Sequence, residues 1–260
     1  MESHSRTEDK IEMGTIIDLH GKNIIVTGAG SGIGRETSCV LAREGATVIM
    51  MDISAEGLAE TTSMGGEHCH SYPIDLTDVK AVTDAFSEII DNYGKLDGLV
   101  HCAGISSRKP LNVLTKDGFE KILNVNFYAF VDLVKTFAKK KNSNDGSSIV
   151  VMSSISSIRG YKAKSEYNVS KAAVDAFVRC MSLELSSRKI RVNSIMPGEV
   201  LTPMAIRAKE LAAAANANEY IQPLGPTYPY EVANLIAFLL SNATKTITGT
   251  SIRIDGGVCV

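Results

Sequence analysis

The chain has no tryptophan, only seven prolines, and five cysteines that include no C-x-x-C pair. An odd number of cysteines without such pairs argues against a disulfide framework and against a zinc site built from cysteines. The segment His68-Cys69-His70 contains three candidate metal ligands. Alternate residues of a strand share a face, so only His68 and His70 could bind the same metal ion. Two imidazoles without a carboxylate do not make a site, and we expect no metal.

The sequence also lacks any strong excess of charge and any long apolar run. The formal net charge is -2, which gives no electrostatic reason to expect nucleic acid or an anionic membrane as a partner. No run approaches the ~18 apolar residues that a membrane span requires. The polar segment Met1–Lys10 has no apolar core of a secretory signal, so the expected compartment is the cytoplasm.

The 260 residues, 44% hydrophobic and 22% charged, are enough for one large α/β domain. Apolar strand-like runs alternate with helical patterns. The expected strands are 23–27, 47–51, 70–74, 99–102, 148–152, 191–196 and 251–254, and the expected helices are 33–44, 79–92, 115–140, 167–187 and 230–240. Continuous apolar strands separated by helices predict a doubly wound parallel sheet, a Rossmann fold, in a single domain.

The expected domain covers residues 19–260 and follows a polar N-terminal leader, 1–18. The irregular segment 200–227 contains the alanine run Ala212–Ala215 and, after that run, Pro223, Gly225 and Pro226. An alanine-rich helical piece between such residues is a candidate lid, which should be ordered over bound ligands.

A glycine-rich turn lies between the first expected strand and the first expected helix, in Thr27–Gly34. Its candidate cofactor-binding residues are Gly28, Gly30, Ser31, Gly32, Ile33 and Gly34. Glycines let the backbone approach a pyrophosphate, and the helix N-terminus offers N–H groups to it. Asp52 directly follows the second expected strand, 18 residues after Gly34, near the ~20-residue spacing of a carboxylate that binds the adenosine ribose. Asp75 could face the adenine, although a role in a turn or helix cap is a serious competing interpretation.

Tyr167 and Lys171 are four residues apart at the start of an expected helix, so their side chains share one face. A nearby ammonium favours the phenolate and lowers the pKa of a tyrosine, which suits proton transfer during hydride transfer. Ser154 follows an expected strand 13 residues before Tyr167. Strand C-termini converge on the ligand crevice in this fold, so Ser154 and Tyr167 could reach one substrate oxygen.

With these motifs in order, the chain resembles the short-chain dehydrogenase/reductase superfamily from about Leu19 to Gly257. The matching positions are T-G-x-x-x-G-x-G at 27–34, Asp75-Leu76, Ala103-Gly104, Asn126, Ser154, Tyr167, Lys171, Pro197-Gly198, Thr202 and Asp255-Gly256-Gly257. The resemblance implies that Ser154 orients the substrate oxygen and Tyr167 is the general acid or base. It implies that Lys171 binds the nicotinamide ribose and lowers the pKa of the tyrosine, and that Asn126 holds a relay water. It also implies that Pro197, Gly198 and Thr202 lie beside the nicotinamide. It further implies that the protein forms a homodimer or homotetramer.

The sequence departs from the resemblance after the fourth strand, where His101-Cys102 precede Ala103-Gly104 and the family often has two asparagines. This puts hydrogen bonds that stabilise the sheet in doubt. Cys102 is interpreted as a small buried residue rather than a redox switch.

The expected function is interconversion of a secondary alcohol and a ketone. NAD is favoured over NADP because Asp52 would repel a 2′-phosphate, although Arg35 could offset that repulsion. Two alternatives stay open, an NADPH-dependent 3-oxoacyl-(acyl-carrier-protein) reductase and a non-catalytic dinucleotide-binding sensor. Lys109 and four further cations (Arg108, Arg159, Lys162 and Lys164) fall on loops expected near the substrate. They indicate either attraction of an anionic substrate or a solvated basic rim.

Overall fold

The computed structural model describes residues 17–207 and 221–260, and within them it contains one parallel sheet. The strands are β1 Asn23–Thr27, β2 Thr47–Asp52, β3 Cys69–Pro73, β4 Leu96–His101, β5 Ser143–Met152, β6 Arg191–Pro197 and β7 Ser251–Ile254. Their order is β3-β2-β1-β4-β5-β6-β7, and each neighbouring pair is parallel. The chain reverses its winding between β1 and β4, which is where a doubly wound sheet opens its ligand crevice.

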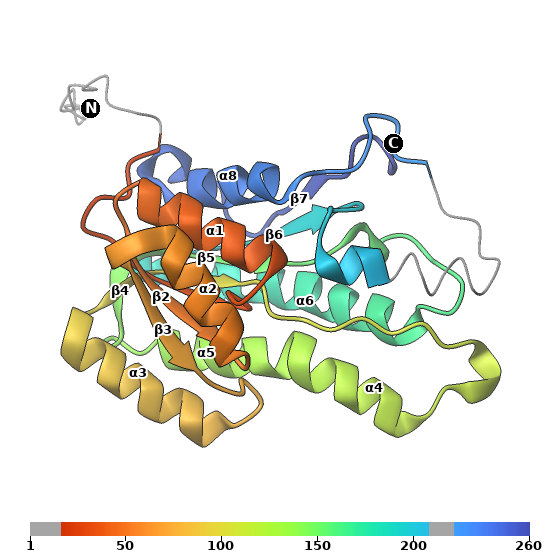
Figure 1. The fold of residues 1–260 in the computed structure, drawn as a ribbon, viewed down its shortest axis with the longest axis horizontal. Helices are drawn as coiled ribbons and strands as arrows, with labels where there is room; N and C mark the ends of the chain where they lie inside the picture. The colour runs from red at the N-terminus through yellow and green to blue at the C-terminus, as the bar shows by residue number, and fades with distance from the viewer. Residues whose placement is uncertain (1–16, 208–220) are drawn as a thin grey trace, which may run out of the picture.

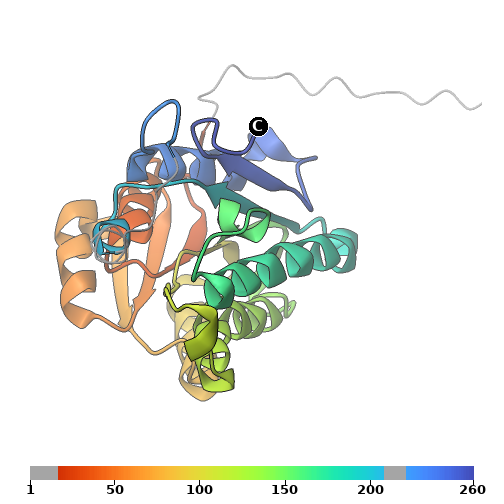
Figure 2. The ribbon, with the colours of Figure 1, turned by 90° about the vertical axis from the view of Figure 1, so that its right-hand side faces the viewer.

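Helices cover both faces of the sheet (Figure 1). They are α1 Gly32–Arg43, α2 Ala55–Gly65, α3 Val79–Tyr93, α4 Lys116–Leu123, α5 Ala129–Phe137, α6 Ser165–Glu184 and α8 Pro229–Leu240. Helices α1, α2 and α8 pack on one face, and α3, α5 and α6 pack on the other. The turned view places α8 and α6 on opposite sides of β6 (Figure 2).

Alternate residues of each central strand enter different cores, which explains the continuous apolar runs in the sequence. In β1, Ile24 and Val26 pack under α1 and α8, whereas Ile25 packs under α3 and α5. All three side chains are fully buried. A strand covered on both faces has no solvent side and therefore no polar alternation. The predicted fold class is confirmed.

Two predicted features of the helices are corrected by the structure. Helix α2 was not predicted, because only Leu58 and Thr61 of its eleven residues are buried and the apolar periodicity is weak. The expected single helix 115–140 is interrupted by a π-helical turn at Asn124–Tyr128 and ends at Phe137. A π turn inserts an extra residue and redirects the side chains that follow, which an apolar pattern does not reveal.

Candidate active site

The glycine turn after β1 packs closely against the neighbouring backbone and leads directly into α1. Gly28 has φ +67°, and a Cβ there would lie 2.6 Å from the backbone nitrogen of Ala103. A Cβ on Gly34 would lie 2.1 Å from the carbonyl oxygen of Gly28. Ser31 precedes α1, and its side chain makes no capping hydrogen bond to the helix. The first N–H groups of α1 therefore keep their capacity to bind an anion, and the turn fits a pyrophosphate.

Asp52 lies directly beside this turn. Its Oδ2 accepts a hydrogen bond from the Gly30 nitrogen at 2.9 Å, and its Oδ1 accepts one from the Ser54 nitrogen at 2.9 Å. A Cβ on Gly30 would lie 3.0 Å from the carboxylate, so glycine permits this approach. Each carboxylate oxygen can accept further bonds, so Asp52 is fixed in place with acceptor capacity left for ribose hydroxyls.

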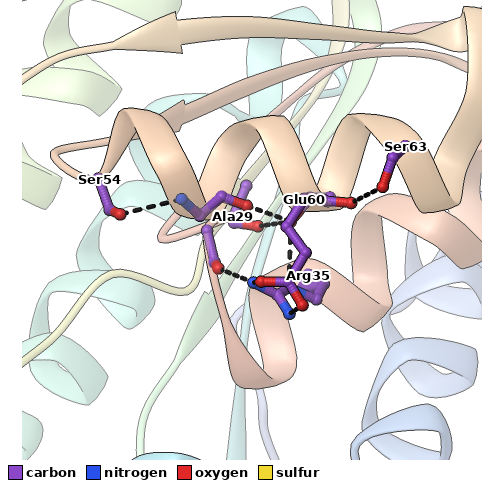
Figure 3. Close-up of polar contacts among 8 residues, drawn as sticks. Ala29, Arg35, Ser54, Glu60 and Ser63 are labelled. Carbon is purple, nitrogen blue, oxygen red and sulfur yellow. Dashed lines mark hydrogen bonds and ion pairs between the residues drawn. The ribbon is translucent and has the colours of Figure 1, made fainter.

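Arg35 lies against Glu60 of α2 (Figure 3). Its guanidinium forms an ion pair with Glu60 at 2.6 Å and donates to the carbonyl oxygen of Gly30. Thr61 of the same helix accepts from Arg35 and donates to the carbonyl oxygen of Ala29. Helix α2 thus holds the turn and neutralises its arginine. Sequence reasoning missed Glu60 because it missed the helix that carries it.

Asp75 and Leu76 lie after β3, and both have structural roles in the observed geometry. Asp75 Oδ1 accepts from the backbone nitrogen and the hydroxyl of Thr77, and these bonds lower the pKa of the carboxyl. Leu76 is buried in the core beneath α3. The turn interpretation therefore describes the contacts of Asp75 in this structure, and its contact with adenine stays a prediction.

Ser154 and Tyr167 come together at the C-terminal end of β5. The Ser154 hydroxyl accepts from the Ser156 nitrogen at 3.1 Å and is hydrogen-bonded to Tyr167. Burial raises the pKa of Tyr167, and the bond to Ser154 opposes that rise. The expected lowering of this pKa by Lys171 is not what the structure shows. The reason is geometric, because the ammonium lies 5.7 Å from the ring centroid and donates to the Met152 carbonyl instead.

Lys171 is a buried cation at the centre of the site. Its Nζ lies 2.7 Å from the carbonyl oxygen of Met152. Burial lowers the pKa of Lys171 to about 8, while the carboxylate of Asp175 opposes that effect. Asp175 is also buried, four residues along α6, and accepts a 2.6 Å bond from Ser194. The ammonium is therefore poised between its charged and neutral forms in mildly alkaline solution.

Asn126 occupies the π-helical turn and joins two parts of the site. Its Oδ1 accepts from the Ile105 nitrogen at 2.8 Å, and its Nδ2 donates to the Ile105 carbonyl and the Ser170 hydroxyl. A Cβ on Gly104 would lie 3.2 Å from Asn126 Oδ1 and 3.6 Å from Lys171 Nζ. The side chain of Asn126 thus fixes the loop after β4 against α6, close to Lys171.

His101 and Cys102, which stand where the superfamily often has two asparagines, are accommodated at the end of β4 by other contacts. His101 Nδ1 lies 2.8 Å from the Thr27 hydroxyl, linking β4 to β1, and its ring stacks on Phe130. Burial lowers the pKa of His101 to about 3, so the ring is neutral. Burial also raises the pKa of Cys102 to about 12. Cys102 is half-buried rather than fully buried. A thiol with so little thiolate character supports its interpretation as a small structural residue rather than a redox switch.

The segment after β6 reaches the glycine turn. A Cβ on Gly32 would lie 3.3 Å from Thr202 Cγ2, so Thr202 packs against the turn. Gly198 follows Pro197, and a Cβ there would lie 2.5 Å from Gln222 Oε1. Val200 and Thr227 form a parallel bridge at the base of the expected lid. Its alanine run, Ala212–Ala215, lies outside the described residues.

Comparison with known proteins gives consistent matches. A family profile described as enoyl-(acyl carrier protein) reductase matches residues 28–259. The chain belongs to the short-chain dehydrogenase/reductase superfamily. It is 34% identical over 247 residues to a 3-oxoacyl-(acyl-carrier-protein) reductase of Thermotoga maritima, covering 93% of this chain and 99% of the relative. It is 31% identical over 250 residues to a cyclopentanol dehydrogenase of a Comamonas species, covering 92% and 97%.

Solved structures of the superfamily show the same fold. A short-chain glucose/ribitol dehydrogenase of Brucella melitensis superposes with a TM-score of 0.86 at 26% identity, covering 94% of this chain and 99% of the other. This superfamily is one of oxidoreductases that bind a nicotinamide dinucleotide. The described residues contain no helix able to cross a membrane and no cluster able to hold a metal ion.

Proposed function

We propose that this protein is an NAD(H)-dependent oxidoreductase that interconverts a secondary alcohol and a ketone. The observation that carries the proposal is the meeting of Ser154, Tyr167 and Lys171 at the strand ends beside Gly104. A non-catalytic dinucleotide sensor has no need for a buried lysine next to a hydrogen-bonded serine and tyrosine pair. NADH absorbance with a panel of alcohols and ketones tests the proposal, and no turnover with any of them would count against it.

In the proposed mechanism, the dinucleotide supplies or accepts the hydride when it is bound. Ser154 holds the substrate oxygen, and Tyr167 gives that oxygen a proton in the reductive direction or takes one in the oxidative direction. Lys171 binds the nicotinamide ribose and brings positive charge to Tyr167. Asn126 holds the loop after β4 close to Lys171 and connects Lys171 to solvent through water. Gly28, Gly30, Gly34 and the start of α1 hold the pyrophosphate.

The preference for NAD follows from two charges in the proposed ribose site. A 2′-phosphate about 4 Å from the Asp52 carboxylate would be repelled by roughly 4 kcal/mol at an effective dielectric near 20, before salt screening. Arg35 is the cation that could offset this repulsion, but Glu60 already neutralises it. We therefore expect Asp52→Ala to lower the ratio of kcat/KM for NAD to that for NADP by at least about tenfold.

Glu60→Gln supplies a second, independent variant for the same ratio. It keeps Asp52 and frees the charge of Arg35, so the ratio should fall by a smaller factor than in Asp52→Ala. Glu56→Gln in the first turn of α2 is the control and should leave the ratio unchanged. A wild type that prefers NADPH would contradict the assignment.

A second activity, reduction of a 3-oxoacyl group carried on a carrier protein, is favoured by the Thermotoga maritima relative. This second activity would be favoured if the enzyme turned over a 3-oxoacyl thioester with NADPH faster than simple ketones with NADH.

We also propose a homo-oligomer, either a homodimer or a homotetramer. Apolar side chains on the outer surface of the π turn and α6 stay exposed in one chain, among them Tyr128 (50%) and Leu183 (77%). Exposed apolar residues of this size on neighbouring elements suit an interface between copies. Light scattering at micromolar concentration should give at least twice the mass of one chain, and a monomeric mass would contradict the proposal.

In this proposal, residues 1–18 are a polar leader and 19–260 form the catalytic domain. The segment 200–227 is its lid, which excludes water from the path of the hydride. Buried hydrogen bonds hold the base of the lid, because Gln222 accepts from the Glu199 nitrogen and donates to Thr227.

A further inference from the structure

The loop between β4 and α4 is fastened to the residues that precede Tyr167. It has no regular structure apart from a short 3-10 turn at Leu111–Val113. Lys109, near its middle, makes two contacts with the other side. Its backbone nitrogen donates to the Ala163 carbonyl at 2.7 Å, and its Nζ lies 3.2 Å from Glu166 Oε1. One residue therefore joins the loop to the start of α6 through both its backbone and its charge.

Glu166 is a buried carboxylate whose charge is compensated by Lys109. Its side chain is 1% exposed, whereas that of Lys109 is 42% exposed. The second carboxylate oxygen, Oε2, has no hydrogen-bond partner among the described residues. A buried charge is tolerated only when it is paired or well hydrogen-bonded. The ion pair with Lys109 is thus the contact on which this carboxylate depends.

The surrounding backbone is shaped to accept the pair. A Cβ on Gly118 of α4 would lie 2.1 Å from Glu166 Oε1 and 2.9 Å from Lys109 Nζ, so a larger residue there would displace the ends of the paired side chains. Ala163, whose carbonyl receives the Lys109 backbone bond, has φ +63°, an uncommon conformation for a residue with a Cβ. Backbone held in such a conformation is maintained by its surroundings and is concentrated near functional sites. The loop, α4 and the start of α6 therefore meet at one built contact.

We propose that Lys109 and Glu166 are positioning residues, whose ion pair holds the β4–α4 loop against the start of α6 and so fixes Tyr167 relative to the substrate. The catalytic part of this inference rests on the proposed function. Glu166 directly precedes Tyr167 on α6, and consecutive helix residues point about 100° apart. Glu166 can therefore be anchored on α4 and the loop while Tyr167 faces Ser154. The same loop begins at Ala103-Gly104, beside Lys171, so a shift of the loop changes both sides of the site.

Kinetic comparison of Lys109→Met, Glu166→Gln and the double variant tests the inference. Each single variant should lower kcat by about ten- to a hundredfold, because displacements near 1 Å from productive geometry cost up to this much. The Kd for NADH should stay within about twofold, since the glycine turn is untouched. The double variant should be no worse than the poorer single variant, because residues that act as one unit are not additive. Lys109→Arg should recover most of the rate.

Lys116→Met is the matched control, because Lys116 and Glu120 form an ion pair of the same kind on the exposed surface of α4. It should change neither kcat nor local protection. A fall in thermal midpoint in Lys109→Met and Glu166→Gln with unchanged kcat would overturn the positioning role and leave a structural one.

Hydrogen exchange separates failure of this inference from failure of the proposed function. Peptides covering 103–112 and 163–170 should exchange faster in Lys109→Met than in wild type, with the rest of the chain unchanged. Absence of turnover in the wild type would defeat the proposed function, and the exchange result would then decide alone whether the pair fastens the loop. Unchanged exchange in these peptides overturns the inference in either case.

Discussion

Replacement of Tyr167 by phenylalanine should lower kcat by about 10²–10⁴ and leave the affinity for NADH nearly unchanged. The variant keeps the aromatic ring and its packing and removes only the hydroxyl that bonds to Ser154. Without that hydroxyl, the group left at the proposed substrate oxygen is the Ser154 hydroxyl, which is a much weaker acid than a phenol. Stopped-flow or steady-state kinetics at saturating NADH and substrate measure the rate, and quenching of NADH fluorescence measures the affinity.

Tyr93→Phe is the matched control for this experiment. Tyr93 also has a phenol hydrogen-bonded to a neighbouring hydroxyl, that of Tyr72, but it lies on α3, away from the site. It should show wild-type kcat. A Tyr167→Phe enzyme with near-normal kcat would defeat the acid–base role, whereas loss of NADH binding would indicate that the ring had shifted.

Elements with strong apolar patterns could be predicted from the sequence, whereas elements stabilised mainly by tertiary contacts could not. Strands such as β1 and β2 are apolar on both faces because helices cover both faces of the sheet. Their positions can therefore be predicted from continuous apolar runs in the sequence. Helix α2 buries only two side chains and is held by its Ser54 cap and its contacts with the glycine turn. Its existence was therefore beyond an argument from periodicity, and so was the Arg35–Glu60 ion pair that bears on cofactor choice.

The site shows the same division. The positions of Ser154, Tyr167 and Lys171 could be predicted because strand ends and helix spacing determine them. The partners of these residues could not. Lys109 resembled one of several surface cations near the substrate, yet it pairs with the buried Glu166, which the sequence analysis did not single out. The pairing depends on the close approach of Gly118, which is 48 residues before Glu166 in the chain and adjacent to it in space.

Replacement of Lys171 by methionine should weaken NADH binding and lower kcat together, because in the proposed mechanism the ammonium both binds the nicotinamide ribose and fixes its position. Hydrogen bonds to a charged group contribute about 1.5–3 kcal/mol, so the Kd should rise roughly ten- to a hundredfold at pH 7. The value of kcat should fall as well, since without the ammonium the nicotinamide ribose is no longer held in position for hydride transfer. Methionine keeps the length of the buried stem, so the packing between β5 and α6 is disturbed little.

The pH dependence distinguishes this role of Lys171 from a purely steric one. With a pKa of about 8, the ammonium is fully charged well below pH 8 and loses its proton as the pH rises through that value. Wild-type affinity for NADH should therefore fall between pH 7 and pH 9, and Lys171→Met should show weak affinity without that fall. These neighbouring groups do not titrate in this window, because the pKa of His101 is about 3, that of Cys102 is about 12 and that of Tyr167 is raised from its ordinary value by burial. Equal slopes in the wild type and the variant would show that another group controls the affinity, and the assignment of Lys171 to the ribose would then be wrong.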